Sequence, residues 1–337
     1  MDGVKPTIYD IARLSQVSIA TVSKVLNGTG RISEETRQRV MQAVEALGYE
    51  RSTIATALAG KNTYTIGFLV PDVSNPFFSE ILRGAEDAAF ARGYSVLVCN
   101  TDHDPERERV YLRTLRQKQM DGLVIATGST AAETVAELVA EGVRVVLLSR
   151  EIEGVSVGAV TIDNVLGGEL AARHLVQLGH RRVGVIPEPL HLASSRDRLH
   201  GFERALRAAG AECSVAPAGG FGISAGARMA KQVLADPSIT AVFALNDQLA
   251  VGALEALREL GKHVPGDVSV IGFDDTILAR IVYPSLTTVA QPMQTLGQRT
   301  LELLIDAIES GDQPTERVVI PPTLVVRAST APPAGRV

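Results

Sequence analysis

The chain is poor in cysteine and has no long apolar run, and both absences narrow the kind of protein it can be. Its 337 residues include only two cysteines, Cys99 and Cys213, which are far apart and have no histidine or cysteine at metal-binding spacing. We therefore expect neither a disulfide framework nor a metal site, and no motif calls for a cofactor. No apolar stretch approaches the roughly 20 residues of a membrane span, and the N-terminus lacks the pattern of a signal peptide. A cytoplasmic protein is expected.

The first 27 residues predict two short helices joined by a tight turn. Their apolar residues recur at helical spacing on two faces, with Ile8, Ile11, Ala12 and Leu14 on the first and Val22, Val25 and Leu26 on the second. Ser18 can cap the second helix by accepting a hydrogen bond from a free backbone N–H. This is the helix-turn-helix arrangement, in which the second helix enters the major groove of DNA.

A third helix is predicted over residues 33–47, with Ser33 as its cap and Gly48 at its end. The candidates for contact with bases and phosphates are Thr7, Tyr9, Ile19, Ala20, Thr21, Ser23, Lys24, Asn27 and Arg37. The alternative is a small helical bundle that does not bind DNA, in which serine and threonine are only caps and Lys24 is only solvated.

Residues 52–60 begin with Ser52 and end at Gly60, which favours a further short helix. An isolated helix of this length is marginal in water, so it needs a partner to stay formed. A segment poised between coil and helix is suited to act as a switch.

The charge is unevenly distributed along the chain. The overall net charge is -5, but residues 1–63 carry eight Lys and Arg against six Asp and Glu, a balance of +2 that leaves -7 on the remainder. Because this local excess is modest, we expect phosphate contacts to depend on individually placed residues and helix N-termini as well as on net charge.

From Tyr64 onward, apolar runs typical of strands alternate with helical patterns. The expected strands are 65–70, 95–99, 122–126, 143–148, 182–186, 241–245 and 268–273. This alternation is typical of parallel sheets covered by helices on both faces, and its interruption near Asp163 predicts two doubly wound lobes of the α/β class. Open sheets of this kind bind ligands outside the carboxyl ends of their strands.

Several polar and aromatic residues stand where a ligand between the lobes would meet them. The candidates are Arg150, Arg198, Asn246, Asp274 and Gln291 for hydrogen bonds to a polyhydroxylated ligand, and Phe77, Phe78 and Phe221 for the apolar faces of a sugar ring. A purely structural role is the alternative for each of them. Phe77 can belong to the core of its lobe, and the neighbouring Asp247 and Asp275 can cap a helix and a turn.

The order and spacing of these motifs resemble the LacI family of bacterial transcription regulators. The similarity runs through residues 7–58, 66–78, 121–122, 178–181, 243–247, 272–275 and 286–291 to Ser329, and so covers nearly the whole chain. It implies a DNA-binding headpiece over 1–51, a hinge helix over 52–61, a periplasmic-binding-protein-like effector domain over 62–330 and a tail over 331–337. Within that domain, lobe one would comprise 62–163 and 291–321, and lobe two 164–290 and 322–330, so that the chain crosses between them three times.

The resemblance also assigns roles to particular residues. Leu58 occupies the position where relatives wedge a leucine into the DNA minor groove, and Arg198, Asn246 and Asp274 fall where relatives hold effectors. The family further implies a homodimer on an approximately palindromic operator. Adjacent prolines after Arg327, with no leucine heptad, exclude the C-terminal helical bundle that makes some relatives tetrameric.

The chain departs from the family pattern at three places. The proline that usually precedes the hinge helix is missing from Tyr49-Glu-Arg-Ser52, which removes a fixed φ angle. Ser149 stands before Arg150 where many members have aspartate, and Gly220 replaces an aspartate often seen before Phe221. The last two changes lie at the expected pocket, so they leave the identity of the effector open.

Two motifs suggest an enzyme, and we favour neither. Gly222-Ile-Ser-Ala-Gly226 matches the nucleophile elbow, but a poor strand precedes it, and Ser224 is better suited to capping the next helix. Gly60-Lys61 lacks the other residues of a phosphate loop. His174 and His180 flank one helix end, where His180 better suits the helix dipole than a metal.

The sequence therefore predicts an effector-controlled repressor, whose ligand is expected to be a sugar or sugar derivative. The alternative from another class is a cytoplasmic solute-binding protein, or a sugar-processing enzyme, that does not bind an operator.

Overall fold

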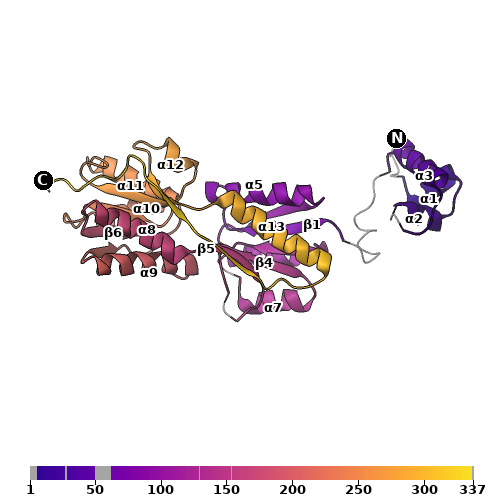
Figure 1. Cartoon of the computed structure of the whole chain (residues 1–337), viewed down its shortest axis with the longest axis horizontal. Helices are drawn as coiled ribbons and strands as arrows, with labels where there is room; N and C mark the ends of the chain where they lie inside the picture. Colours follow the sequence, from indigo (N-terminus) through magenta and orange to yellow (C-terminus); the bar gives the residue numbers. More distant parts are fainter. Residues whose placement is uncertain (1–5, 27–28, 50–61, 129, 153, 336–337) are drawn as a thin grey trace. The chain divides into compact units, whose positions relative to one another are not determined.

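The computed structural model describes residues 6–26, 29–49, 62–128, 130–152 and 154–335 (Figure 1). The chain divides into two compact units, Met1–Thr63 and Tyr64–Val337. The predictions for Asn27, for Leu58 and for the hinge helix over 52–61 lie outside the described residues.

The first unit contains the three predicted helices, α1 Ile8–Ser15, α2 Ile19–Leu26 and α3 Glu34–Leu47. Ile11, Val22 and Val40, one from each helix, are fully buried against one another in its core. The backbone N–H of Thr21 donates to Ser18 Oγ at 3.1 Å, which confirms the predicted cap of α2. Ser33 caps α3 and Gly48 ends it with a left-handed φ of 58°, also as predicted.

The prediction that Leu14 lies on the apolar face of α1 is wrong. Leu14 is 53% exposed, and the buried position beside it belongs to Ser15. Ser15 can be buried because its hydroxyl donates to the carbonyl of Ile11 at 2.7 Å, so that no polar group is left unsatisfied.

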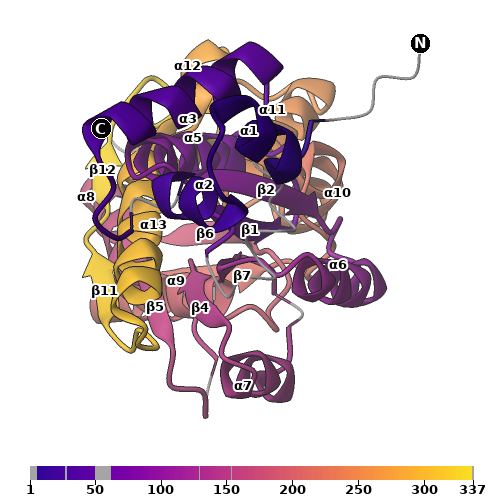
Figure 2. The same ribbon diagram turned by 90° about the vertical axis from the view of Figure 1, so that its right-hand side faces the viewer.

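Lobe one of the second unit is a parallel sheet between two pairs of helices. Its strands are β1 Thr65–Val70, β2 Ser95–Asn100, β3 Gly122–Ile125, β4 Arg144–Leu148, β5 Gly158–Ile162 and β11 Arg317–Ile320, in the order β11-β5-β4-β3-β1-β2. Helices α5 Pro76–Ala91 and α13 Met293–Ser310 cover one face, and α6 Pro105–Gln117 and α7 Ala132–Ala140 the other (Figure 2). Phe68 faces α5 and α13 while its neighbour Leu69 faces α6 and α7. This burial on both faces explains why β1 is an uninterrupted apolar run.

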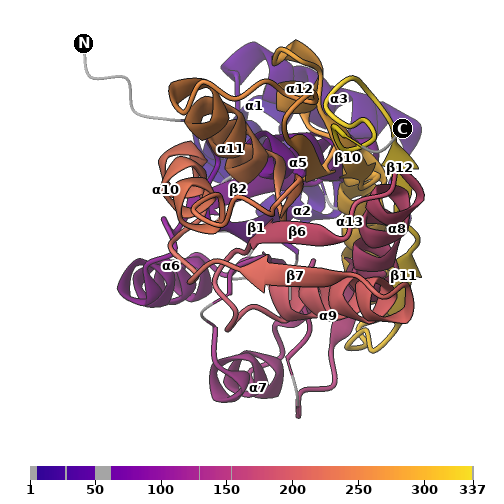
Figure 3. The same cartoon turned by 90° about the vertical axis from the view of Figure 1, so that its left-hand side faces the viewer.

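Lobe two repeats this architecture. Its strands are β6 Arg182–Ile186, β7 Glu212–Val215, β8 Ala241–Ala244, β9 Ser269–Asp274, β10 Thr287–Ala290 and β12 Thr323–Val325, in the order β12-β10-β9-β8-β6-β7. Helices α8 Asn164–Gln177 and α9 Ala193–Ala208 cover one face, and α10 Ile223–Val233 and α11 Asp247–Glu259 the other (Figure 3). A short helix, α12 Ile277–Ile281, follows β9. Strand β12 runs antiparallel to β10, so this sheet is not wholly parallel.

The chain crosses between the lobes three times, as predicted. It leaves lobe one after β5, returns after β10 to form α13 and β11, and ends in lobe two with β12. None of the described helices combines the length and the apolar character needed to cross a lipid bilayer.

Candidate functional site

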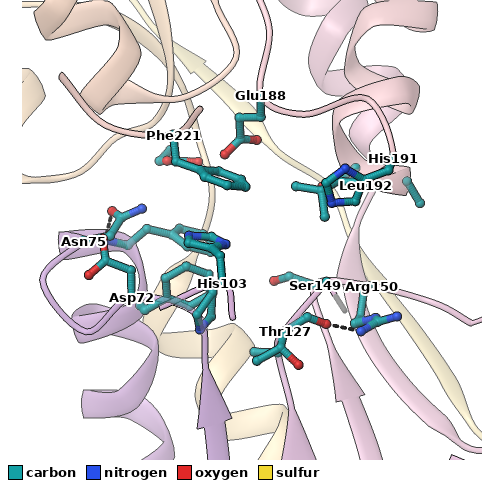
Figure 4. Close-up of a pocket in the computed structure, with 18 of the residues that line it drawn as sticks. Asp72, Asn75, His103, Thr127, Ser149, Arg150, Glu188, His191, Leu192 and Phe221 are labelled. Carbon is teal, nitrogen blue, oxygen red and sulfur yellow. Dashed lines mark hydrogen bonds between the residues drawn. The ribbon is translucent and has the colours of Figure 1, made fainter. Parts of the chain in front are cut away.

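A cavity of about 180 Å³ lies between lobe one and lobe two, at the carboxyl ends of their strands (Figure 4). We call it the cleft. Its lining includes Asp72, Asn75, Phe77, Phe78, His103, Thr127, Ser149, Arg150 and Glu151 from lobe one, and Glu188, His191, Leu192, Arg196, Arg198, Phe221, Gln248 and Asp274 from lobe two. In each sheet the cleft lies where the strand order reverses, between β1 and β3 and between β6 and β8, which is where open α/β sheets hold ligands.

Arg198 on α9 is the cationic centre of the cleft. Its Nε donates to Asn164 Oδ1 at 2.9 Å, and its Nη1 donates to the carbonyl of Leu245 at 2.6 Å. The guanidinium lies 3.9 Å from the centre of the Phe273 ring, so its position is fixed from several sides. Arg198 is only 6% exposed.

Two carboxylates face this guanidinium. Glu188 Oε2 lies 3.6 Å and Asp274 Oδ1 3.9 Å from Arg198 Nη1. Burial raises the pKa of Asp274 well above its ordinary value, and the opposing effect of Arg198 does not offset this. Gln291 supports the carboxyl by donating from Nε2 to Asp274 Oδ1 at 2.6 Å.

Asn246 and Gln291 do not line the cleft, although both were candidates for direct contact. Asn246 caps α11, because its Oδ1 accepts from the backbone N–H of Leu249 at 2.7 Å. Its Nδ2 donates to Glu188 Oε1 at 2.9 Å, which links the ends of β8 and β6 across the reversal of strand order. Asn246 and Gln291 therefore position the carboxyl groups of Glu188 and Asp274.

Asp247 is not the cap of α11, which is Asn246. Asp247 is 1% exposed and accepts hydrogen bonds from the backbone N–H of Thr276 at 2.7 Å and from the Thr288 hydroxyl at 2.8 Å. It thereby joins α11 to the segment after β9. Burial raises its pKa to about 7.

Arg150 lines the cleft but is largely occupied by its own lobe. Its guanidinium donates to the backbone carbonyls of Thr127 and Thr130, the second at 3.2 Å, and so holds the loop that follows β3. Burial lowers the pKa of Arg150. Arg150 therefore has fewer N–H groups free to donate to a ligand than the sequence suggested.

Several lining residues were not candidates from the sequence, above all His103, His191 and Glu188. His103 stacks on Phe221, with 3.7 Å between ring centroids, and joins lobe one to lobe two. Burial lowers the pKa of His103. Its position follows β2 in a short turn with a φ of 58°, and periodicity gives no sign of such a contact. Glu188 follows β6 and could have been noticed by the strand-end rule that identified Arg150.

The helix-turn-helix unit presents most of its candidate residues to solvent. Ile19 is 41% and Tyr9 68% exposed, Ala20 and Lys24 are exposed, and Ser23 is partly exposed. Three other candidates also make local contacts. The Thr7 hydroxyl donates to Asp10 Oδ2 at 2.7 Å, Thr21 Oγ1 lies 2.9 Å from Ser18 Oγ, and Arg37 Nε lies 3.8 Å from Glu34 Oε2. DNA contact by these residues stays a prediction.

The geometry around the elbow-like motif does not match a nucleophile elbow. Strand β7 ends at Val215, Gly222 is the N-cap of α10, and Ser224 lies inside the first turn rather than capping it, which corrects the expectation. Across the described ranges, no group of three or more His, Cys, Asp or Glu side chains is arranged to hold a metal ion.

The expected role of His180 at a helix dipole is also wrong. Its ring is buried, with Nδ1 2.9 Å from Thr240 Oγ1 and Nε2 3.0 Å from the carbonyl of Ala331. Burial lowers the pKa of His180, which favours the neutral imidazole. Ala331, assigned above to the tail, is therefore bonded to lobe two.

Comparison with known proteins agrees with this architecture. Residues 7–52 match the model of bacterial regulatory proteins of the lacI family, and residues 172–330 match that of the periplasmic binding protein-like domain. The HTH-type transcriptional regulator DegA of Bacillus subtilis is 39% identical over 334 residues, which cover 98% of this chain and 99% of DegA. The ribose operon repressor of Halalkalibacterium halodurans is 37% identical and is covered to 97%, with 96% of this chain aligned.

Solved structures of full-length and shorter regulators are also similar. The lac repressor dimer bound to operator and the anti-inducer ONPF has a TM-score of 0.86 at 28% identity, with 97% of this chain and 100% of that chain covered. A LacI family regulator of Enterococcus faecium with bound ribose has a TM-score of 0.73 at 36% identity, with 80% of this chain and 99% of that chain covered.

A helix-turn-helix unit joined to two periplasmic-binding-protein-like lobes defines a class of effector-controlled transcription regulators. The chain belongs to the lacI family of bacterial regulatory proteins. It is a DNA-binding transcriptional regulator.

Proposed function

We propose that this regulator represses transcription by binding an approximately palindromic operator as a homodimer, and that an uncharged polyhydroxylated effector in the cleft controls its operator affinity. In this proposal the regulator acts in the cytoplasm and catalyses no reaction. Headpiece residues 1–51 and a hinge over 52–61 would contact DNA, and lobes one and two would hold the effector.

One observation in the cleft carries the effector proposal. Ser149 Oγ is buried in the cleft wall and has no hydrogen-bond partner among the described residues. A buried hydroxyl without a partner costs free energy, which a ligand hydroxyl would recover. Glu188 and Asp274 supply carboxyl oxygens on the opposite lobe, and Phe77 and Phe221 supply apolar surface. This combination suits a sugar.

The relatives support this ligand class. The Enterococcus faecium regulator was solved with ribose, and the Halalkalibacterium halodurans relative is named for the ribose operon. Because the cleft draws Ser149 from lobe one and Arg198 from lobe two, a ligand bound there favours the lobe orientation that makes both contacts. A coupling of about 1 to 3 kcal/mol would change operator affinity roughly 5- to 150-fold.

Exposed apolar residues on both lobes support dimerisation. Strand β2 is an edge strand with Leu97 38% and Val98 41% exposed, and α12 with the segment after it exposes Ile277, Ile281 and Tyr283. Soluble proteins rarely leave such groups open, and a second copy of the chain would cover them. The lac repressor is a dimer on its operator, which supports the same arrangement here.

A gel-shift screen tests operator binding. Fragments from the region upstream of the chain's own gene are incubated with the full-length protein and excess nonspecific competitor, and one fragment should be retained. A solute-binding protein or an enzyme would retain none. Sedimentation at micromolar concentration should give about twice the chain mass, and a dominant tetramer would contradict the proposed dimer.

The Ser149→Ala variant tests the cleft. Operator affinity without sugar should equal that of the wild type, because the hydroxyl has no hydrogen-bond partner among the described residues. The change in operator affinity caused by ribose, or by the sugar identified in a thermal-shift screen, should be at least several-fold smaller than in the wild type. An undiminished response would place the effector elsewhere.

A further inference from the structure

The guanidinium groups of the cleft are already matched with acceptors of the protein. Arg196 Nη1 donates to the carbonyls of Leu190 at 3.0 Å and His191 at 2.8 Å, and Arg150 donates to two carbonyls of its own lobe. Arg198 has two carboxyl groups within 4 Å, those of Glu188 and Asp274. The carbonyls occupy donors of Arg150 and Arg196 but are neutral, so among the described residues only Arg198 of these three groups has a carboxyl group within 4 Å.

Glu188 is the carboxylate best placed to determine the charge balance around Arg198. Its side chain is 15% exposed and lines the cleft, with Oε2 toward Arg198 and Oε1 held by Asn246 Nδ2 at 2.9 Å. An Asn246 that itself caps α11 cannot turn away without losing its bond to Leu249. The charge of Glu188 is therefore fixed at the cleft surface by elements of the lobe core.

We infer that Glu188 is a specificity-determining residue, which makes the cleft select uncharged polyhydroxylated effectors and reject phosphorylated or carboxylated ones. The inference rests on the proposed effector function of the cleft. A ligand anion beside Arg198 would meet the carboxylate of Glu188 in a half-closed space, where like charges repel more strongly than in water. An uncharged hydroxyl meets no such repulsion, and it can donate to the same carboxylate.

The variant Glu188→Gln isolates the charge. A glutamine has the same shape, and its Oε1 can still accept from Asn246 Nδ2, so the link between β6 and β8 is kept. Arg198 would then have one carboxylate fewer and would be open to an anion. Glu86→Gln is the matched control, because it removes the same charge at an exposed position on α5 that does not line the cleft.

The test uses the full chain and three probes at matched ionic strength: D-ribose, ribose 5-phosphate and inorganic phosphate. Calorimetry and thermal shift should show no binding of either phosphate probe to the wild type or to Glu86→Gln. Glu188→Gln should bind inorganic phosphate or ribose 5-phosphate at least tenfold more tightly than either of them. If the wild type binds ribose, that affinity should exceed its affinity for ribose 5-phosphate.

Two results would overturn the inference. One is wild-type binding of ribose 5-phosphate equal to or tighter than that of ribose, and the other is no gain of phosphate binding in Glu188→Gln. If Glu188→Gln does not fold, Glu188→Ala carries the same comparison with phosphate. These binding measurements need no DNA. A negative result with Glu188→Gln would therefore not contradict operator binding, and a failed operator screen would not affect the measured selectivity for charge.

Discussion

The imidazole of His103 stacks on the phenyl ring of Phe221, with 3.7 Å between ring centroids and 9° between ring planes. His103 follows β2 in lobe one, and Phe221 precedes α10 in lobe two, so the stack joins the lobes across the cleft (Figure 4). Burial lowers the pKa of His103, so a neutral ring makes this contact at neutral pH. Aromatic pairs contribute about 0.5 to 1.5 kcal/mol beyond the area they bury, which is enough to bias the orientation of two lobes.

Removing His103 should therefore open the cleft. The chain contains no tryptophan, so Phe221→Trp places a single indole at this contact. Adding His103→Ala to that variant should shift the tryptophan emission to longer wavelength and increase its quenching by acrylamide, because water gains access to the ring. His263→Ala, at an exposed site that does not line the cleft, is the control and should change neither quantity. Identical spectra with and without His103 would show that the stack does not hold the lobes together.

Gly168 lets α8 and α9 approach closely, and its replacement should destabilise lobe two. A Cβ added at Gly168 would lie 2.0 Å from the carbonyl oxygen of Arg198, which is backbone and cannot rotate aside. We expect Gly168→Ala to lower the free energy of unfolding by about 1 to 3 kcal/mol despite the better helix propensity of alanine. Unfolding in urea measures this loss of unfolding free energy. Gly266→Ala should be close to neutral, since its nearest neighbour is a side-chain carbon at 3.8 Å, and equal losses in both variants would refute the packing explanation.

The buried carboxyl of Asp247 should make stability fall as the pH rises. Burial penalises the charged form and raises the pKa of Asp247 from its ordinary value of 3.8 to about 7 in the folded protein. The folded state thus holds the proton more tightly, and the resulting stability is fully present below about pH 4 and is lost as the pH rises through 7. The difference in unfolding free energy between wild type and Asp247→Asn should decrease by about 2 to 4 kcal/mol over this range.

This difference is measured by chemical unfolding at a series of pH values, so that titrations shared by both proteins cancel. Asp87→Asn removes an exposed carboxyl on α5 and serves as the comparison for loss of a carboxyl at the surface. A pH-independent difference for Asp247→Asn would mean that the buried carboxyl stays ionised.

The sequence predicted β1, β3, β4, β6, β8 and β9 and also the edge strand β2. It missed β5 and β10, although both are largely buried, and it missed β7, β11 and β12. Strands β1 and β6 have the predicted bounds because every position after the first is buried and apolar. Strands β7 and β11 alternate between exposed and half-buried residues, and β12 has only three residues, so none of them forms an apolar run. Their places are set by pairing with β6, β5 and β10.

The sequence predicts which residues at strand ends belong to the site, but it does not predict the contacts between them. Asp274 is the last residue of β9 and Arg150 comes two residues after β4, and the rule that ligands bind at strand ends identified both. The sequence gives no sign that Arg150 is occupied by carbonyls of its own lobe, or that Asn246 lies behind Glu188. These depend on side-chain directions that arise only when both lobes are packed.

The final prediction concerns base recognition by α2. Ala20 is exposed at the start of the helix, while Val22 and Val25 on the same helix are buried, so Ala20 faces away from the core. A methyl side chain can contact a thymine methyl but cannot form a bidentate hydrogen bond. Ala20→Gln should therefore shift the preferred half-site toward adenine at one position, with a discrimination of about 1 to 3 kcal/mol. Lys24→Ala should instead weaken all half-sites alike and reduce the salt dependence, as loss of a phosphate contact does. Competition binding against a library of half-site variants distinguishes the two, and a uniform loss for Ala20→Gln would remove Ala20 from the base-reading surface.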